Sequence, residues 1–350
     1  MSLLQPGVDV PAGATYLPAT PDHVLWGRLP CAEDRPVLTI DAGTDVVIDT
    51  ISHEGILEDQ GRDPKAFFGR YGVDALDDAV ELANADVPRT FGVDGPHVTT
   101  GPIAVRGATV GDVLAMTLLE TAQRAPYGVI SNRHDRGALP GEYPREGDVV
   151  SVFARAEGGF GHMPYGPDDD RTVRFPLAPF LGIMGVAVPG GRRPHSVPPG
   201  PHGGNIDISL LTVGSTLYLP VLVDDALAYV GDPHFAQGDG EVALTAMEAP
   251  LRATMRFDVI PREDAIREFG ELLGPLGFTY EYLVPTGMDE DLDVAVQNCV
   301  RAAIALLQAR FGMDPAHAYA YLSAATDFNI SQVVDLVKGV HARIRMADFA

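Results

Sequence analysis

The chain repeats one local pattern, a glycine turn followed by a run of β-branched and aliphatic residues. The pattern occurs at Gly43–Ile48, Gly111–Leu114, Gly147–Val150 and Gly214–Leu217. Each turn predicts a hairpin or barrel corner, and each apolar run after it predicts a strand. Strands at such intervals are typical of a β-rich sandwich or barrel. No strict repeat length connects them, which argues against a solenoid or propeller.

Three other segments depart from the strand pattern. The segment from Glu58 to Asp86 has weak helical spacing of its apolar residues. The stretches Gly158–Asp170 and Val188–Gly204 are rich in glycine and proline and predict loops. The second loop should be stiff because of its prolines. It leads directly into a polar cluster, where we expect it to form a wall that limits substrate size.

After Pro261 the pattern becomes helical. Apolar residues recur at helical spacing from Asp291 to Phe311, and Gly312 is expected to end this helix. Asp314 and Pro315 are expected to open a second helix as N-cap and first turn. Ser331 is expected to cap a third helix, whose mixture of apolar and polar residues would suit an interface between subunits. Because soluble oligomers are usually symmetric, we predict a homo-oligomer.

These elements predict an α+β fold with a β-rich core, a barrel or sandwich of mixed strands, and a C-terminal helical layer. We place the β-rich catalytic core at residues 1–260. The helical layer would occupy residues 261–350 and pack on the core as one cooperative unit.

The charge composition of the chain excludes some classes of binding partner. The 350 residues include 48 Asp plus Glu and 25 Lys plus Arg, a formal net charge of −23. Nucleic-acid binding and attraction to anionic membranes both rest on clustered cations, so neither partner is expected. Cys31 and Cys299 imply no disulfide framework. The N-terminal segment lacks the pattern of a signal peptide, and we expect a cytoplasmic protein.

Two short clusters concentrate the polar chemistry. The first is His202–Asp207, and the second is Gly231–Glu241, which holds three acids and a histidine among three glycines. Glycine disfavours a helix and permits tight turns that aim carboxylates and an imidazole at one point. Divalent metals bind such a ligand set. Asp207 and His234 are the first candidate ligands, and Asp232 is a further ligand, an acceptor that braces His234, or a plain turn acid.

The same clusters hold the candidate catalytic residues. Glu241 is expected to begin a strand over residues 241–247, where its carboxylate could be a general base or a ligand. Asp239 shares these two roles, and the sequence does not divide them. Asn205 and Asp207 would face the same way on a strand, so that Asn205 could orient a ligand or the substrate. His202 is a candidate ligand, substrate contact or loop residue.

The two clusters resemble the signature of the acetamidase/formamidase family. Further similar stretches are Thr100–Ile103, Gly107–Leu114, Pro179–Gly182 and Leu217–Val221. The resemblance runs from about His23 to about Val334. It implies hydrolysis of a short amide to ammonia and an acid, with bound metal. The family pattern often carries an acid near the early pair His53 and Glu54, which adds both residues as candidate ligands.

The other histidines of the first two hundred residues are expected to be structural or solvated. They are His23, His97, His134, His162 and His195.

We therefore expect a metal-dependent amidohydrolase for formamide- or acetamide-class substrates. A divalent metal polarises the carbonyl and lowers the pKa of water from about 15.7 to roughly 7, and a carboxylate moves the proton. Zinc is the expected metal, with calcium or another divalent ion as the alternative. Hydrolysis of a carbamate or urea-like bond remains open, as does a binding module with a structural calcium ion. Lysine-dependent amidase chemistries fit poorly, because Lys65 and Lys338 are the only lysines.

Overall fold

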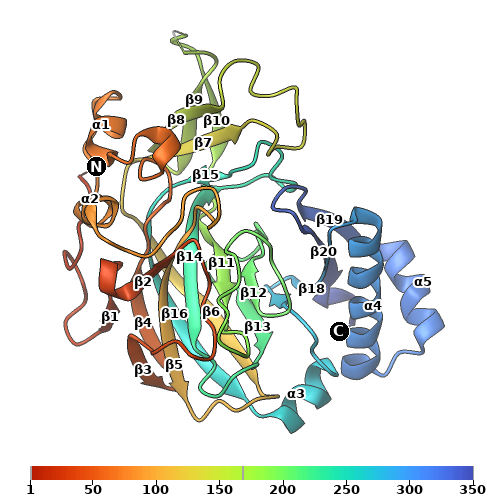
Figure 1. The fold of residues 1–350 in the computed structure, drawn as a ribbon. Coiled ribbons are helices and arrows are strands. Elements are labelled where there is room, and N and C mark those ends of the chain that lie inside the picture. The colour runs from red at the N-terminus through yellow and green to blue at the C-terminus, as the bar shows by residue number, and fades with distance from the viewer. Residues whose placement is uncertain (1, 168, 350) are drawn as a thin grey trace.

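Two large β-sheets dominate the computed structural model, which describes residues 2–167 and 169–349 (Figure 1). Within these ranges the first sheet has nine strands in the order β1-β4-β16-β6-β13-β17-β18-β20-β19. Their bounds are β1 Thr15–Leu17, β4 Thr44–Asp49, β6 Val113–Gln123, β13 Thr216–Pro220, β16 Leu251–Ile260, β17 Leu276–Phe278, β18 Tyr282–Asp289, β19 Asp327–Gln332 and β20 Lys338–Arg345.

The second sheet follows the path β10-β9-β8-β7-β15-β14-β11-β12, and β5 joins it by pairing with β14, β2 and β3. The bounds are β2 Val24–Trp26, β3 Leu38–Asp41, β5 Val98–Arg106, β7 Tyr127–Arg133, β8 Val149–Glu157, β9 Phe160–Pro164, β10 Thr172–Pro176, β11 Phe180–Gly185, β12 Gly203–Asn205, β14 Ala228–Ala236 and β15 Met247–Glu248.

The helices lie at the edges of this β structure (Figure 1). They are α1 Pro64–Gly69, α2 Asp77–Asn84, α3 Arg262–Phe269, α4 Leu292–Phe311 and α5 Pro315–Ala325, with short 3₁₀ turns at Pro21–His23, Glu58–Gln60 and Met346–Phe349. Among the described residues, no helix combines the length and apolarity that a bilayer crossing would require.

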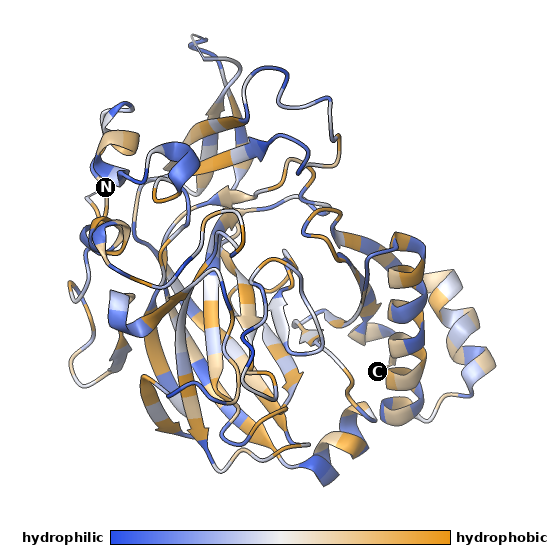
Figure 2. Ribbon diagram, in the orientation of Figure 1, coloured by the Kyte–Doolittle hydropathy of each residue, from blue (hydrophilic) through white to orange (hydrophobic). Residues whose placement is uncertain are grey.

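The main apolar core draws on both sheets. Ile48, Leu217 and Met255 enter it from the first sheet, and Leu181 and Phe235 enter it from the second. In Figure 2 hydrophobic positions run along the central strands, while α4 shows hydrophobic and hydrophilic positions on different sides. The predicted α+β fold, a β-rich core with helices added near the C-terminus, is thereby confirmed.

Most local expectations hold. The four glycine turns lead into β4, β6, β8 and β13. Asp291 caps α4 by accepting hydrogen bonds from the backbone N–H groups of Asp293 and Val294, and Gly312 ends this helix in a left-handed conformation. Asp314 caps α5 in the same way, with Pro315 in the first turn.

The third C-terminal helix is a wrong prediction. Ser331 lies in β19, which pairs with β20 and extends the first sheet. The Ser331 hydroxyl is 2.9 Å from His341 Nδ1 on the neighbouring strand. Residues 261–350 thus contribute β17–β20 as well as helices. The subunit interface predicted on that helix is therefore not supported. The division between a core and a helical layer at residue 260 stays a prediction.

Three further details differ from the expectations. Gly231–Ala236 is not a turn, because these residues belong to the buried strand β14. The segment 241–246 is irregular rather than a strand, since Glu241 and Leu244 both have positive φ and interrupt extended backbone. The predicted loop Gly158–Asp170 includes β9, which pairs with β8 and β10 as a hairpin ribbon.

Candidate metal and catalytic site

Strand β14 supplies the centre of the site. Asp232 and His234 lie two positions apart on this strand, and both side chains are buried. Strand β11 pairs with β14 on one side, and the short strand β15 on the other places Glu248 opposite His234. His234 Nε2 is 3.0 Å from Glu248 Oε1 and 3.1 Å from Asp232 Oδ2. The register of three strands therefore assembles this part of the site.

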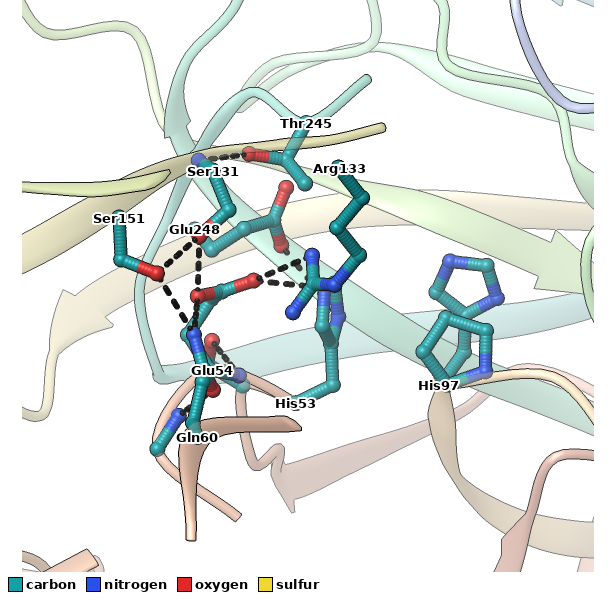
Figure 3. A network of polar contacts seen from close by, with 12 residues as sticks. His53, Glu54, Gln60, His97, Ser131, Arg133, Ser151, Thr245 and Glu248 are labelled. Carbon is teal, nitrogen blue, oxygen red and sulfur yellow. Dashed lines mark hydrogen bonds and ion pairs between the residues drawn. The ribbon is translucent and has the colours of Figure 1, made fainter. Parts of the chain in front are cut away.

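Two earlier histidines complete one side of the cluster. His53 Nδ1 lies 3.2 Å from Asp232 Oδ1, and His97 Nε2 lies 3.8 Å from Asp232 Oδ2. The two imidazole rings meet edge to face, with their centroids 5.3 Å apart. In Figure 3 the His53 ring lies near Glu248, and His97 lies on the far side of His53.

Asp207 and Glu241 complete the other side. Asp207 Oδ1 is 4.0 Å from His234 Nδ1. The backbone N–H of Asp207 donates to the Gly182 carbonyl at 3.2 Å, which holds this residue next to β11. Ligand atoms from Asp207, His234 and Glu241 lie within 4.8 Å of one another, as do those of His53, His97 and Asp232, and those of Asp232, His234 and Glu248.

Many buried polar atoms in this cluster have no hydrogen-bond partner among the residues that the structure describes. They are His53 Nδ1, Asp207 Oδ1 and Oδ2, Asp232 Oδ1, His234 Nδ1 and Glu248 Oε2. Buried polar atoms in proteins are almost always satisfied, so a concentration of unpaired ones needs an explanation. Imidazole nitrogens and carboxylate oxygens are the donors that divalent transition metals prefer. The residues present therefore fit one or more divalent ions.

The pKa shifts of the buried histidines and acids also favour a bound cation. Burial alone would lower the pKa of His53 and of His234, but the facing carboxylates outweigh burial, raising the pKa of His53 to about 10 and that of His234 well above its ordinary value. Burial and the neighbouring acids raise the pKa of Asp207 and of Glu241. Four buried acids in one place repel one another, and a bound cation would relieve that repulsion.

Backbone strain aims three of the carboxylates. Asp207, Asp232 and Glu241 have φ values of 45°, 48° and 46°. Such left-handed conformations are uncommon for residues other than glycine and cost of order 1–3 kcal/mol each. Each of these three candidate ligands is therefore held by a backbone conformation that costs free energy.

Gly182 on β11 makes room for the cluster. A methyl group at this position would lie 3.0 Å from Asp232 Oδ2 and closer still to side-chain atoms of Asp207 and His234. Any larger residue would therefore displace the candidate ligands.

Glu54 lies behind His53 rather than among the proposed ligands. Its Oε1 is 3.4 Å from His53 Nε2 and accepts a hydrogen bond from Arg133 at 3.2 Å. Its Oε2 accepts hydrogen bonds from Ser131 Oγ at 2.5 Å and from Gln60 (Figure 3). Burial would raise the pKa of Glu54, but Arg133 and His53 outweigh it and lower the pKa to about 2. Glu54 is therefore an ionised brace for His53.

The structure places two predicted residues outside the cluster. The Asp239 carboxylate accepts hydrogen bonds from Ser209, Asn329 and Arg343, and it is not buried. The glycines on either side of Asp239 turn it toward the C-terminal strands. His202 is buried beside Gly200 and Gly204, and it belongs to none of the three ligand groups found among the described residues. Asn205 does face the site, as a buried side chain at the end of β12.

Sequence reasoning missed His97, Glu248 and Asp335. Glu248 and Asp335 carried a usable signal, since each is a single acid within an otherwise largely apolar stretch. His97 was expected to be structural or solvated, and nothing in its neighbours at the start of β5 distinguishes it. Its proximity to Asp232 depends on the pairing of β5 with β14.

A cleft of about 730 Å³ opens onto the cluster. His53, His97, Asp232 and Glu248 line it, together with Asn205, Glu241 and Asp335. Other residues of segments 89–96, 133–136 and 333–336 also contribute to its walls. The predicted proline-rich wall contributes only His195 and Val197.

The comparisons with known proteins agree on one family. The model of the acetamidase/formamidase family matches residues 187–346. A formamidase of Methylophilus methylotrophus is 27% identical over 306 residues, which cover 69% of this chain and 74% of the relative. An acetamidase of Mycolicibacterium smegmatis is 28% identical over 235 residues, covering 51% of this chain and 57% of the relative.

The fold extends the likeness to nearly the whole chain. The crystal structure of an acetamidase from Bacillus halodurans superposes with a TM-score of 0.74 at 25% identity, covering 95% of this chain and 98% of that one. A γ-lactamase from Delftia acidovorans shares the fold more distantly, with a TM-score of 0.56 and 22% identity. The family match includes the segments that carry Asp207, Asp232, His234 and Glu248. The chain is thus similar to members of the acetamidase/formamidase family.

Proposed function

We propose that this protein hydrolyses a short linear amide of the formamide or acetamide class to ammonia and a carboxylic acid, using a divalent metal. The similarity to formamidases and acetamidases supports a hydrolase that acts on carbon–nitrogen bonds in linear amides. The proposal adds two points to this general activity: the substrate is a short amide, and the reaction requires a divalent metal. The concentration of unpaired, buried donor atoms around Asp232 and His234 carries the metal part.

The ligand groups support two neighbouring sites. His53, His97 and Asp232 would hold one ion, and Asp207, His234 and Glu241 would hold another. The third group, Asp232, His234 and Glu248, takes one residue from each of these sets. Three imidazoles among the donors favour zinc, or manganese or iron, over calcium. A divalent ion held here would act as a Lewis acid toward the amide carbonyl and make water a better nucleophile near neutral pH.

The chain's own residues supply proton transfer and orientation. Glu241 lines the cleft with a buried carboxylate, and we assign it as the general base or as a ligand that shares this role. Asn205 lines the same cleft and would orient the substrate through its side-chain amide. Glu54 and Arg133 hold His53 in place from behind. Asp239 takes no part, because Arg343 and Asn329 occupy its carboxylate.

Two alternatives remain distinct. A carbamate or urea-like substrate would use the same chemistry on a related carbon–nitrogen bond. A structural calcium site in a binding module would have oxygen ligands only, and the three histidines of the cluster argue against it.

We further propose a cytoplasmic homo-oligomer as the working form of the enzyme.

The test is ammonia release from formamide, acetamide, propionamide, methyl carbamate and urea. Each is measured with protein as purified, after chelator treatment, and after restoring zinc, manganese or iron. We expect hydrolysis of a primary amide that is lost on chelation and returns with metal. Full activity in metal-free protein would refute the metal requirement, and preference for the carbamate or urea would select the first alternative.

A further inference from the structure

One buried acid in the cleft is absent from all three ligand groups found among the described residues. Asp335 is 9% exposed and lines the same cleft as Asn205, Glu241 and Glu248. Its Oδ2 is buried without a hydrogen-bond partner, and no ligand group among the described residues includes it. A buried carboxylate without a partner is costly, so its retention at a cleft needs a reason.

We propose that Asp335 is a catalytic residue that binds the nitrogen end of the substrate by accepting a hydrogen bond from the amide N–H. This assignment rests on the proposed amide hydrolysis. The chemistry of an amide separates its two ends, because the carbonyl oxygen only accepts hydrogen bonds while the N–H groups donate them. A metal ion held by the cluster would attract the carbonyl oxygen, which leaves the nitrogen end in need of an acceptor. A carboxyl group offers an acceptor oxygen whether or not it carries a proton, whereas the side-chain amide of Asn205 can present either atom.

The backbone holds Asp335 in an unusual conformation. It lies in the tight turn between β19 and β20, where Asp335 and Leu336 have φ values of 64° and 69°. The N–H of Val337 donates to the Asp335 carbonyl at 2.8 Å, and the Gln332 side chain donates to the Val337 carbonyl at 2.8 Å. Two successive left-handed residues other than glycine are strained, and here the strain directs an acid into the cleft.

The turn is also tied to the segments that carry the candidate ligands. The Val333 N–H donates to the Gly240 carbonyl at 3.0 Å, next to Glu241. The Gln237 side chain donates to the carbonyls of Asp207 and Ser331, at 2.8 and 3.2 Å. The position of Asp335 relative to Asp207 and Glu241 is therefore set by direct hydrogen bonds rather than by a free loop.

Asp335→Asn is the decisive variant. Asparagine is nearly the same size and tolerates left-handed backbone well, so the turn should keep its shape. The change removes the negative charge and one acceptor oxygen. Asp327→Asn is the matched control, since it makes the same change at an exposed residue of the same hairpin. Asp335→Glu tests whether a carboxylate at slightly longer reach restores function.

The measurements are bound metal, melting temperature, and kcat and KM for the preferred primary amide. The same variants are assayed on 4-nitrophenyl acetate, an ester without an N–H group. We expect Asp335→Asn to keep its metal and its melting temperature while kcat/KM for the amide falls roughly ten- to hundredfold. Ester hydrolysis should change by less than about twofold, Asp327→Asn should match wild type, and Asp335→Glu should recover part of the lost activity.

Three results would overturn the assignment. They are a fall of less than about threefold for the amide, an equal fall for amide and ester, or a loss of metal in step with activity. Failure of the wild-type protein to hydrolyse any amide would instead refute the proposed function. The two failures are therefore distinguishable.

Discussion

Glu54 Oε1 lies 3.4 Å from His53 Nε2, and the other ring nitrogen of His53 faces Asp232. A carboxylate that contacts the second nitrogen of a metal-binding histidine fixes the orientation of the ring and makes it a better ligand. Arg133, Ser131 and Gln60 in turn hold Glu54, so that the geometry of the candidate ligand groups depends on residues outside them.

The first prediction concerns this brace. Glu54→Gln should weaken metal binding by about 10–100-fold while all proposed ligands remain, because the ring of His53 loses its anionic partner. Competition with a chelator of known affinity measures the change. Ser151→Ala is the control, since Ser151 contacts Gln60 and Ser131 but not Glu54. Equal metal affinity in wild type and Glu54→Gln would show that the contact has no role in binding.

The second prediction concerns Glu241. Glu241→Gln keeps the shape of the side chain but removes its charge and basicity. If Glu241 is the general base, kcat should fall by roughly 10²–10⁴ with metal retained. If it is also a ligand, metal content should fall as well. Elemental analysis beside steady-state kinetics separates the two roles, and near wild-type values in both would remove Glu241 from the site.

The third prediction concerns the room that Gly182 leaves for the candidate ligand side chains. Gly182→Ala should displace Asp207, Asp232 and His234, so we expect loss of metal and activity together with destabilisation of roughly 1–3 kcal/mol from overpacking. Gly69→Ala is the matched control, because a methyl group there meets no atom within 4 Å. Metal content and urea unfolding are the measurements. A Gly182→Ala protein with full metal would mean that the strands can shift apart without cost to the site.

The fourth prediction concerns pH and the proline-rich loop. Asp34 accepts hydrogen bonds from Arg193 on this loop and from the backbone N–H of Cys31. Burial alone would raise the pKa of Asp34, but these two partners outweigh it and lower the pKa. Its stabilising contribution is therefore complete above the unfolded-state pKa of about 3.9 and is lost as pH falls through the lower folded-state value.

Asp34→Asn should accordingly be less stable than wild type near neutral pH, by roughly 0.5–1 kcal/mol because the pair is partly exposed. The difference should shrink as pH falls from about 7 to about 3. Urea unfolding across this range tests it, with the exposed pair of Asp41 and Arg106 as the comparison. A difference that is constant with pH would show that the charge of Asp34 is not responsible.

Local patterns predicted the local structure well. Asp291 and Gly312 marked both ends of α4 because capping depends on residues close in sequence. Asp207 and His234 were singled out because their neighbours are rich in glycine and polar residues. Glu248 was not, since only the register of β15 against β14 sets it opposite His234. Asp239 was grouped with these candidates by its position in the sequence, but its hydrogen-bond partner Arg343 lies on β20 and is remote in sequence.

The left-handed conformations of Asp207, Asp232 and Glu241 also bear on how this protein could be improved in the laboratory. Substituting glycine or asparagine at such positions relieves strain, so a screen that selects only for heat resistance would be drawn to these three residues. The variants selected in this way would be more stable to heat but would lack carboxylates proposed for the site. Engineering for thermal endurance should therefore keep these positions fixed and seek its gains in the helices and hairpins away from the cleft.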